Sequence, residues 1–140
     1  MRGVFDTNVI ISALLFGGRL EFISELLIQG SLTPCFSHAT WRELKRALEY
    51  PHLAKILHKH DLNSDDLLAR LGIGSVFFSD TTSPIAVSRD PADEAILACA
   101  TAASAEVIIT GDKDLLSLAN VFSIPILSPS QFKSFLQSKK

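Results

Sequence analysis

The chain begins with a strand pattern that passes directly into a helix pattern, Gly3-Val4-Phe5-Asp6-Thr7-Asn8-Val9-Ile10-Ile11-Ser12-Ala13-Leu14-Leu15. Residues 3–5 predict a short buried strand, and residues 9–15 predict a helix. Asp6 stands at the junction, where an acid directly after a buried strand has no obvious structural task. This stretch therefore predicts the first unit of an α/β fold and the first candidate functional residue.

The alternation of short apolar runs and helical patterns continues along the chain. Further strands are expected at 33–36, 76–78, 107–109 and 124–127, and helices at 20–29, 38–49, 53–60, 64–71, 91–103, 115–119 and from 129 onward. Strands that alternate with helices predict a three-layer α/β/α arrangement with a mostly parallel central sheet. Since the 140 residues contain no repeat or linker, residues 1–140 are expected to form one domain.

Composition and charge limit the classes of function. The longest apolar stretch, 9–16, is far shorter than the ~20 residues of a membrane-spanning helix. Polar residues at 6–8 interrupt the place of a signal-peptide core, so a cytoplasmic protein is expected. Cys35 and Cys99 lie in apolar surroundings without zinc-site spacing, which predicts buried, reduced thiols. The net charge of −2 argues against binding of nucleic acid by general electrostatic attraction, so a protein of this charge that acts on a polyanion needs bound cations or a local basic patch.

Four acids from distant parts of the sequence are expected at one edge of the sheet. Asp6 and Asp112 follow predicted strands, Glu43 lies early in the helix after the second strand, and Asp93 lies in the first turn of a later helix. Ligands of such sheets bind beyond the carboxyl ends of the strands. Carboxylates gathered there repel one another unless a divalent cation binds. Oxygen ligands alone favour Mg²⁺ or Mn²⁺, and two such ions ~3.5–4 Å apart are typical of phosphodiester cleavage.

Each acid also has a purely structural interpretation. Asp90 precedes a proline and is expected to be the N-cap of its helix. Asp93 could merely favour the helix dipole, and Asp112 or Asp114 could begin the short helix that follows. Glu43 could be a solvated surface charge. Taken together, however, the acids converge on one region, and this convergence favours a functional site.

Four blocks of the sequence occur in the order and at the distances of a known family. They are Val4-Phe5-Asp6-Thr7-Asn8-Val9, then Ser37 with Glu43-Leu44, then Asp90-Pro91-Ala92-Asp93 leading into Ala95-Ile96-Leu97-Ala98, and finally Thr110-Gly111-Asp112-Lys113-Asp114-Leu115-Leu116. Together they resemble a PIN domain over essentially the whole chain. They are most similar to the VapC-like toxins of toxin–antitoxin systems.

This resemblance implies an Mg²⁺- or Mn²⁺-dependent endoribonuclease that hydrolyses phosphodiester bonds in single-stranded regions of RNA. The family's acidic metal ligands, which are its catalytic residues, match Asp6, Glu43, Asp93 and Asp112. Thr110 matches a small polar position beside the metal, and Asn8 a residue that braces the first loop. Asp114 matches an acid of this branch whose role as a ligand is open. The resemblance also implies a homodimer and a cognate antitoxin that inserts a segment near the active site.

Basic residues near the acids are candidates for RNA contacts. Arg46 lies one turn after Glu43, and Lys113 adjoins Asp112, although both could be ordinary surface cations. The main alternative function is a non-catalytic PIN-fold module that binds RNA or a protein, but the complete set of acids favours an enzyme. A phosphoryl-transfer enzyme of the haloacid-dehalogenase type would need a second aspartate where Asn8 stands. A DNA-directed flap nuclease would need a threading insertion that the sequence lacks.

Overall fold

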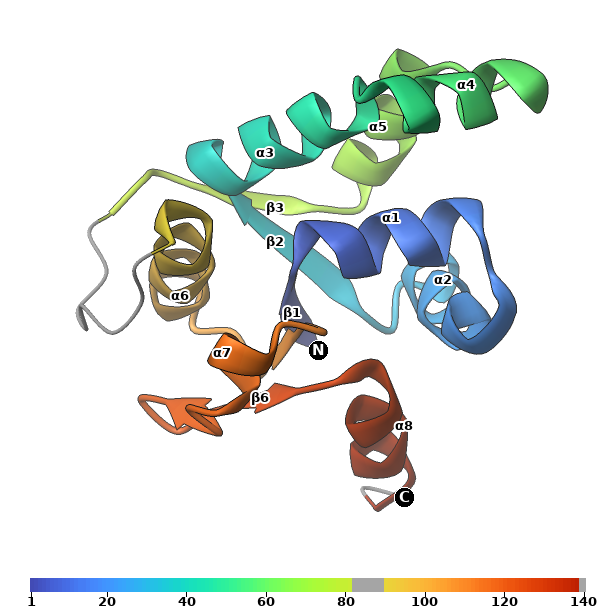
Figure 1. The fold of residues 1–140 in the computed structure, drawn as a ribbon. Coiled ribbons are helices and arrows are strands. Elements are labelled where there is room, and N and C mark those ends of the chain that lie inside the picture. Colours follow the sequence, from blue (N-terminus) through green and yellow to red (C-terminus); the bar gives the residue numbers. More distant parts are fainter. Residues whose placement is uncertain (82–89, 139–140) are drawn as a thin grey trace.

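A six-stranded sheet in the order β3-β2-β1-β4-β6-β5 runs through the centre of the molecule (Figure 1). The computed structural model describes residues 1–81 and 90–138. The strands are β1 (Arg2–Phe5), β2 (Thr33–Ser37), β3 (Val76–Phe78), β4 (Val107–Ile109), β5 (Asn120–Val121) and β6 (Ile124–Leu127). Within these residues every strand pairing is parallel except that of β5 with β6. The mostly parallel sheet predicted from the sequence is therefore confirmed.

Helices cover both faces of this sheet. They are α1 (Thr7–Leu15), α2 (Glu21–Gln29), α3 (His38–Leu48), α4 (Pro51–Lys59), α5 (Ser64–Ile73), α6 (Pro91–Ala103), α7 (Lys113–Leu116) and α8 (Pro129–Ser138), with a 3₁₀ turn η1 (Gly18–Leu20). Figure 1 shows α1, α2 and α8 on one side of the strands and α6 with α7 on the other. No helix in the described ranges is long and apolar enough to cross a membrane.

Alternate residues of the central strands point into two separate hydrophobic cores. Phe5 and Ile109 belong to the core beneath α1 to α5 and α8, whereas Val4 and Ile108 belong to the core beneath α6 and α7. All three residues of β4 are 0% exposed, because a parallel strand covered on both faces has no solvent side. The three-layer α/β/α arrangement follows from this alternation.

Side-chain caps begin several helices at the ends of strands or loops. Asp90 Oδ1 accepts a hydrogen bond from the Ala92 N–H (2.9 Å), which confirms its predicted role as the N-cap of α6. A capping box begins α8, since the Gln131 N–H donates to Ser128 Oγ and the Ser128 N–H donates to Gln131 Oε1. Gly30 ends α2 with a left-handed φ of 75°, as a C-terminal cap.

Some predicted boundaries were wrong. The helix expected at 115–119 is α7, which begins two residues earlier because Asp112 caps it and ends at Leu116. Ala119 instead has a φ of 65° and leads into β5, a strand that the sequence pattern did not predict. The predicted limits of α6 match the structure, and those of the remaining helices differ by at most two residues. The helix α4, for example, begins at Pro51, where proline favours the first helical position.

Both cysteines are free and buried, as predicted. The Cys99 Sγ lies in the core beneath α6 and donates to the Cys35 carbonyl oxygen (3.6 Å). Burial raises the pKa of the Cys99 thiol to about 11 and also raises the pKa of Cys35. Both thiols therefore serve as apolar core groups.

Candidate active site

A pocket of about 480 Å³ opens where β1 and β4 end. We call it the acid pocket; residues at the start of α1, along one face of α3, in the first turns of α6 and at the start of α7 line it. All four acids predicted from the sequence line this pocket: Asp6, Glu43, Asp93 and Asp112. The structure therefore brings together four acids that lie far apart in the sequence.

Thr110 connects two of these acids. Its side chain is 0% exposed, and its Oγ1 donates to Asp6 Oδ2 (2.8 Å) and accepts from the Asp112 N–H (3.0 Å). Asp6 Oδ1 accepts from the Asn8 N–H (3.1 Å), and the Asp6 N–H donates to the Ile109 carbonyl (2.9 Å). Both carboxylate oxygens of Asp6 thus hold hydrogen bonds, and the ends of β1 and β4 are joined through its side chain and backbone.

Asp112 has a structural role besides its place in the pocket. Its Oδ1 accepts from the Asp114 N–H (2.8 Å) and caps α7. The contact of Asp114 with this part of the site is through its backbone, and its side chain is exposed rather than lining the acid pocket. Lys113 is likewise exposed on α7 and does not line the pocket.

Glu43 and Asp93 come from the helices that flank the strand ends. Asp93 is only 4% exposed, because α6 packs against β1, β2 and α3 at this point. Carboxylates are rarely buried to this extent without a task, so the burial of Asp93 goes beyond a simple dipole effect. Glu43 has a side chain 34% exposed and forms a 3.8 Å ion pair with Arg46 Nη1. The two acids therefore differ in environment, one enclosed and one at the rim.

The donor chemistry of the pocket fits a hard divalent cation. Five carboxylates line it, the four predicted acids and Asp90, and no Cys or His is among its described lining residues. As the side chains stand, however, residues 1–81 and 90–138 contain no group of three or more His, Cys, Asp or Glu close enough to hold a metal ion. Asp6 and Asp112 both use Oδ1 to cap a helix. The residue types in the pocket therefore suit a hard divalent cation, but in the described residues their carboxylates do not converge on one point.

Sequence reasoning missed two residues of the acid pocket. Arg42 and Tyr50 line it together with Arg46, and all three side chains are exposed. A signal for Tyr50 was present, since Glu43, Arg46 and Tyr50 follow one another at intervals of three and four residues. Residues at that spacing share one side of a helix and of its immediate extension.

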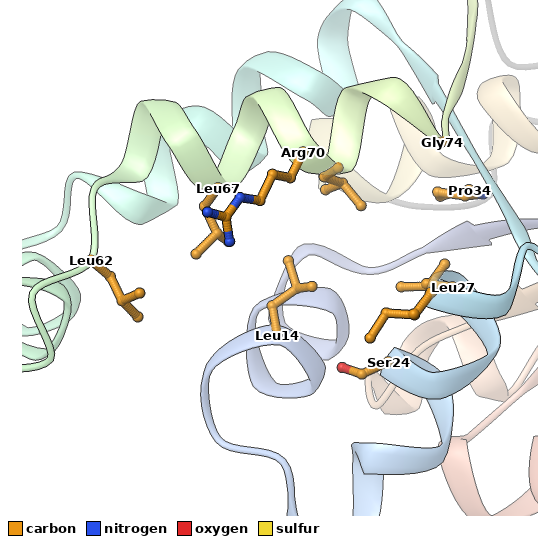
Figure 2. A pocket seen from close by; sticks show the side chains of 10 residues that line it. Leu14, Ser24, Leu27, Pro34, Leu62, Leu67, Arg70 and Gly74 are labelled. Carbon is orange, nitrogen blue, oxygen red and sulfur yellow. The ribbon is translucent and has the colours of Figure 1, made fainter.

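A second pocket, of about 410 Å³, lies away from the acids between α1, α2 and α5. Figure 2 shows Leu67 and Arg70 on α5 pointing toward Leu14 on α1, with Leu27 and Ser24 of α2 beside them. Its described lining carries one cation and no carboxylate. This pocket therefore offers none of the oxygen donors that phosphodiester chemistry at a metal requires.

Comparison with known proteins agrees with the geometry. A family model described as PIN domain matches residues 2–114, a range that contains the four acids and Thr110. No curated protein and no solved structure matches the chain. PIN domains are generally nucleases and typically use a divalent metal ion. Because the match covers well over half of its length, the chain belongs to the PIN domain family.

Proposed function

We propose that this protein is an Mg²⁺- or Mn²⁺-dependent endoribonuclease that hydrolyses phosphodiester bonds in single-stranded regions of RNA. The observation that carries the proposal is that Asp6, Glu43, Asp93 and Asp112 line one pocket at the carboxyl ends of β1 and β4. Membership of a family of nucleases supports the reaction class.

The four acids have different tasks in this proposal. Asp6, Asp93 and Asp112 hold the cation, and Glu43 at the rim completes the site or orients the attacking water. When bound, the cation supplies the positive charge that stabilises the attacking and leaving oxygens of the phosphodiester. Thr110 fixes the carboxylate of Asp6 through its hydroxyl group, and Asn8, in the first turn of α1, donates its N–H to the same carboxylate. Arg46 offsets the charge of Glu43 and faces the RNA phosphates, with Lys113 as a more distant contact.

We further propose that the enzyme acts in the cytoplasm as the toxin of a toxin–antitoxin pair and forms a homodimer. The similarity of the four sequence blocks to VapC-like toxins supports this role. Ile28 and Ile73 are 85% and 88% exposed, and aliphatic surface of this kind is suited to a protein partner. Light scattering of the purified chain tests the dimer, and growth of cells after induction of this chain, compared with Asp6→Asn, tests the toxin role.

A non-catalytic PIN-fold module that binds RNA or a protein is the second candidate. The observation that favours it is the lack of a ready cluster of metal ligands in the described residues. A cleavage assay separates the two functions, because the module would bind RNA without cutting it.

The decisive assay is cleavage of a mixed RNA pool with Mn²⁺ by the wild type and by Asp6→Asn. The substitution keeps an oxygen that can accept from the Asn8 N–H but removes the negative charge. We expect cleavage by the wild type, its loss with a chelator, and its loss in Asp6→Asn. Asp66→Asn, which changes an exposed acid on α5, is the matched control and should cleave normally. Equal cleavage by the wild type and Asp6→Asn would contradict the mechanism. Asp114→Asn, in parallel, tests the open role of that acid.

A further inference from the structure

The segment that includes α3 and α4 carries positive charge in a chain that is negative overall. Between residues 38 and 60, which include α3 and α4, there are five cations and two acids: Arg42, Lys45, Arg46, Lys55 and Lys59 against Glu43 and Glu49. The formal charge of this segment is therefore +3, whereas the whole chain has −2. A polyanion that approaches the anionic pocket is attracted to this side of it.

The part of this segment that borders the acid pocket combines two guanidinium groups with an aromatic ring. Arg42, Arg46 and Tyr50 all line the pocket, and the Arg46 side chain is 64% exposed while Tyr50 is 43% exposed. We call these three residues the α3 edge. The remaining described walls contain no cation, since they come from Asp6 to Asn8, from the start of α6 and from Asp112.

Tyr50 is held in place by its backbone. It is the N-cap of α4, with extended φ and ψ of −61° and 139°, and Pro51 follows it. Its N–H donates to the Ala47 carbonyl, and its carbonyl accepts from the Ala54 N–H (2.8 Å). These hydrogen bonds fix the backbone of Tyr50 where α3 meets α4. The tryptophan of α3 has a different role, because Trp41 packs edge-on against Phe36 and Phe77.

We propose that the α3 edge positions single-stranded RNA: the Tyr50 ring stacks on an unpaired base beside the scissile phosphate, and Arg42 and Arg46 contact the neighbouring phosphates. This inference rests on the proposed ribonuclease function. It adds residues that recognise a base and its neighbouring phosphates, which the four acids alone do not do. Bases stack on exposed aromatic rings only when they are free of a duplex, so the edge selects single strands. From Tyr50 the strand continues along α4 toward Lys55 and Lys59.

The test is binding of a short labelled single-stranded RNA in the presence of a chelator, so that no cleavage occurs. Tyr50→Ala should weaken binding by about tenfold, within the range for one stacked base, while Tyr50→Phe keeps the ring and should bind as the wild type does. Arg42→Ala and Arg46→Ala should each lower the slope of log Kd against log salt by about 0.7, the value for one phosphate contact. The controls are Arg70→Ala, an exposed cation of α5 outside the acid pocket and outside residues 38–60, and Phe16→Ala, an exposed ring elsewhere. Both should leave affinity and slope unchanged.

A second measurement needs no variant, because Tyr50 is the only tyrosine in the chain. Nitration of this ring, read by mass, should slow when single-stranded RNA is bound and should not slow with a duplex of the same sequence. RNA that binds without protecting Tyr50 would overturn the proposal, as would equal loss of single-strand and duplex binding in Tyr50→Ala. Tighter binding of a single DNA strand of the same sequence would contradict the proposal that the α3 edge binds RNA.

The outcomes also separate this inference from the proposed function. If the wild type cleaves RNA and Tyr50→Ala binds and cleaves equally well, only the α3 edge is refuted. If the wild type neither binds nor cleaves any RNA in the pool, the ribonuclease function itself is refuted, and the inference falls with it.

Discussion

The hydroxyl group of Thr110 allows a quantitative test of how the acid pocket is built. Thr110→Val keeps the size and branching of a side chain that is 0% exposed but removes the Oγ1 that bonds Asp6 Oδ2 and the Asp112 N–H. A hydrogen bond to a partly exposed carboxylate contributes about 1.5 kcal/mol, and leaving an N–H without an acceptor costs about 1 kcal/mol or more. We therefore expect the free energy of unfolding to fall by about 2–3 kcal/mol. For a domain of this size, that loss corresponds to a decrease in Tm of roughly 10 °C.

Urea unfolding of the wild type, Thr110→Val and Thr110→Ser provides the measurement. Thr110→Ser retains the hydroxyl group and loses only a buried methyl group, which should cost about 1 kcal/mol. The valine variant should therefore be the less stable of the two, although valine is closer to threonine in volume. If Thr110→Val is as stable as the wild type, or more stable than Thr110→Ser, the reasoning that the hydroxyl joins β1 to α7 is refuted.

Three further predictions follow from the fold. The native protein should not react with a thiol reagent near pH 8, whereas two thiols should react after denaturation. Burial raises the pKa of Cys99 from 9.0 to about 11, so the contribution of this protonated thiol to the free energy of unfolding should be complete below pH 9 and should fall as the pH rises toward 11. Denaturant unfolding at several pH values measures this fall. Replacing Phe122 and Ser123 by Asn-Gly should raise the free energy of unfolding by about 1 kcal/mol, because both residues have positive φ (46° and 66°) in the β5–β6 turn, and an unchanged urea midpoint would contradict this. Asp90→Ala should lower stability by about 1 kcal/mol through loss of the α6 cap, and a simultaneous loss of Mn²⁺ affinity would identify Asp90 as a ligand.

The central strands and α6 were predictable from the sequence for physical reasons. Residues 107–109 are a continuous apolar run, which a strand buried on both faces requires. The predicted limits of α6 were confirmed, since Asp90 and Pro91 mark its start by capping and by a favourable φ. These signals are local, and the tertiary structure agrees with them.

The β5–β6 hairpin could not be predicted in the same way. β5 has two residues, Asn120 and Val121, and among the described strands it pairs with β6 alone. Its turn places Phe122 and Ser123 in left-handed conformations that are typical of glycine or asparagine. The hairpin is therefore maintained by contacts with β6 and the core rather than by turn residues that a sequence pattern would reveal.

The sequence predicted the acids of the site, but it did not predict how the flanking helices enclose some pocket residues and expose others. Asp6 and Asp112 follow parallel strands, and the rule that such strands end at a common edge was enough to bring them together. The burial of Asp93 and the exposure of Tyr50 depend on how α6 packs against α3 and how α3 meets α4. Those orientations arise from side-chain packing between elements, which the spacing of residues within one helix does not determine.

The charge of the acid pocket also explains why the ligands are not gathered in the described residues. Carboxylates without a cation repel one another, and capping bonds hold Asp6 and Asp112 toward backbone N–H groups. Binding of a divalent ion should therefore draw side chains together and stabilise the folded state. At a free Mn²⁺ concentration of about 100 times Kd, the gain would be about 2.7 kcal/mol.

Direct counting of bound Mn²⁺ is the closest test of this account, with the free ion followed by electron paramagnetic resonance in the wild type, Asp6→Asn and Asp112→Asn. We predict at least one Mn²⁺ bound per wild-type chain and clearly weaker binding in both variants, each of which retains its fold. A wild-type chain that leaves all Mn²⁺ free at millimolar concentration, or variants that bind as well as the wild type does, would contradict the claim that these acids form a metal site.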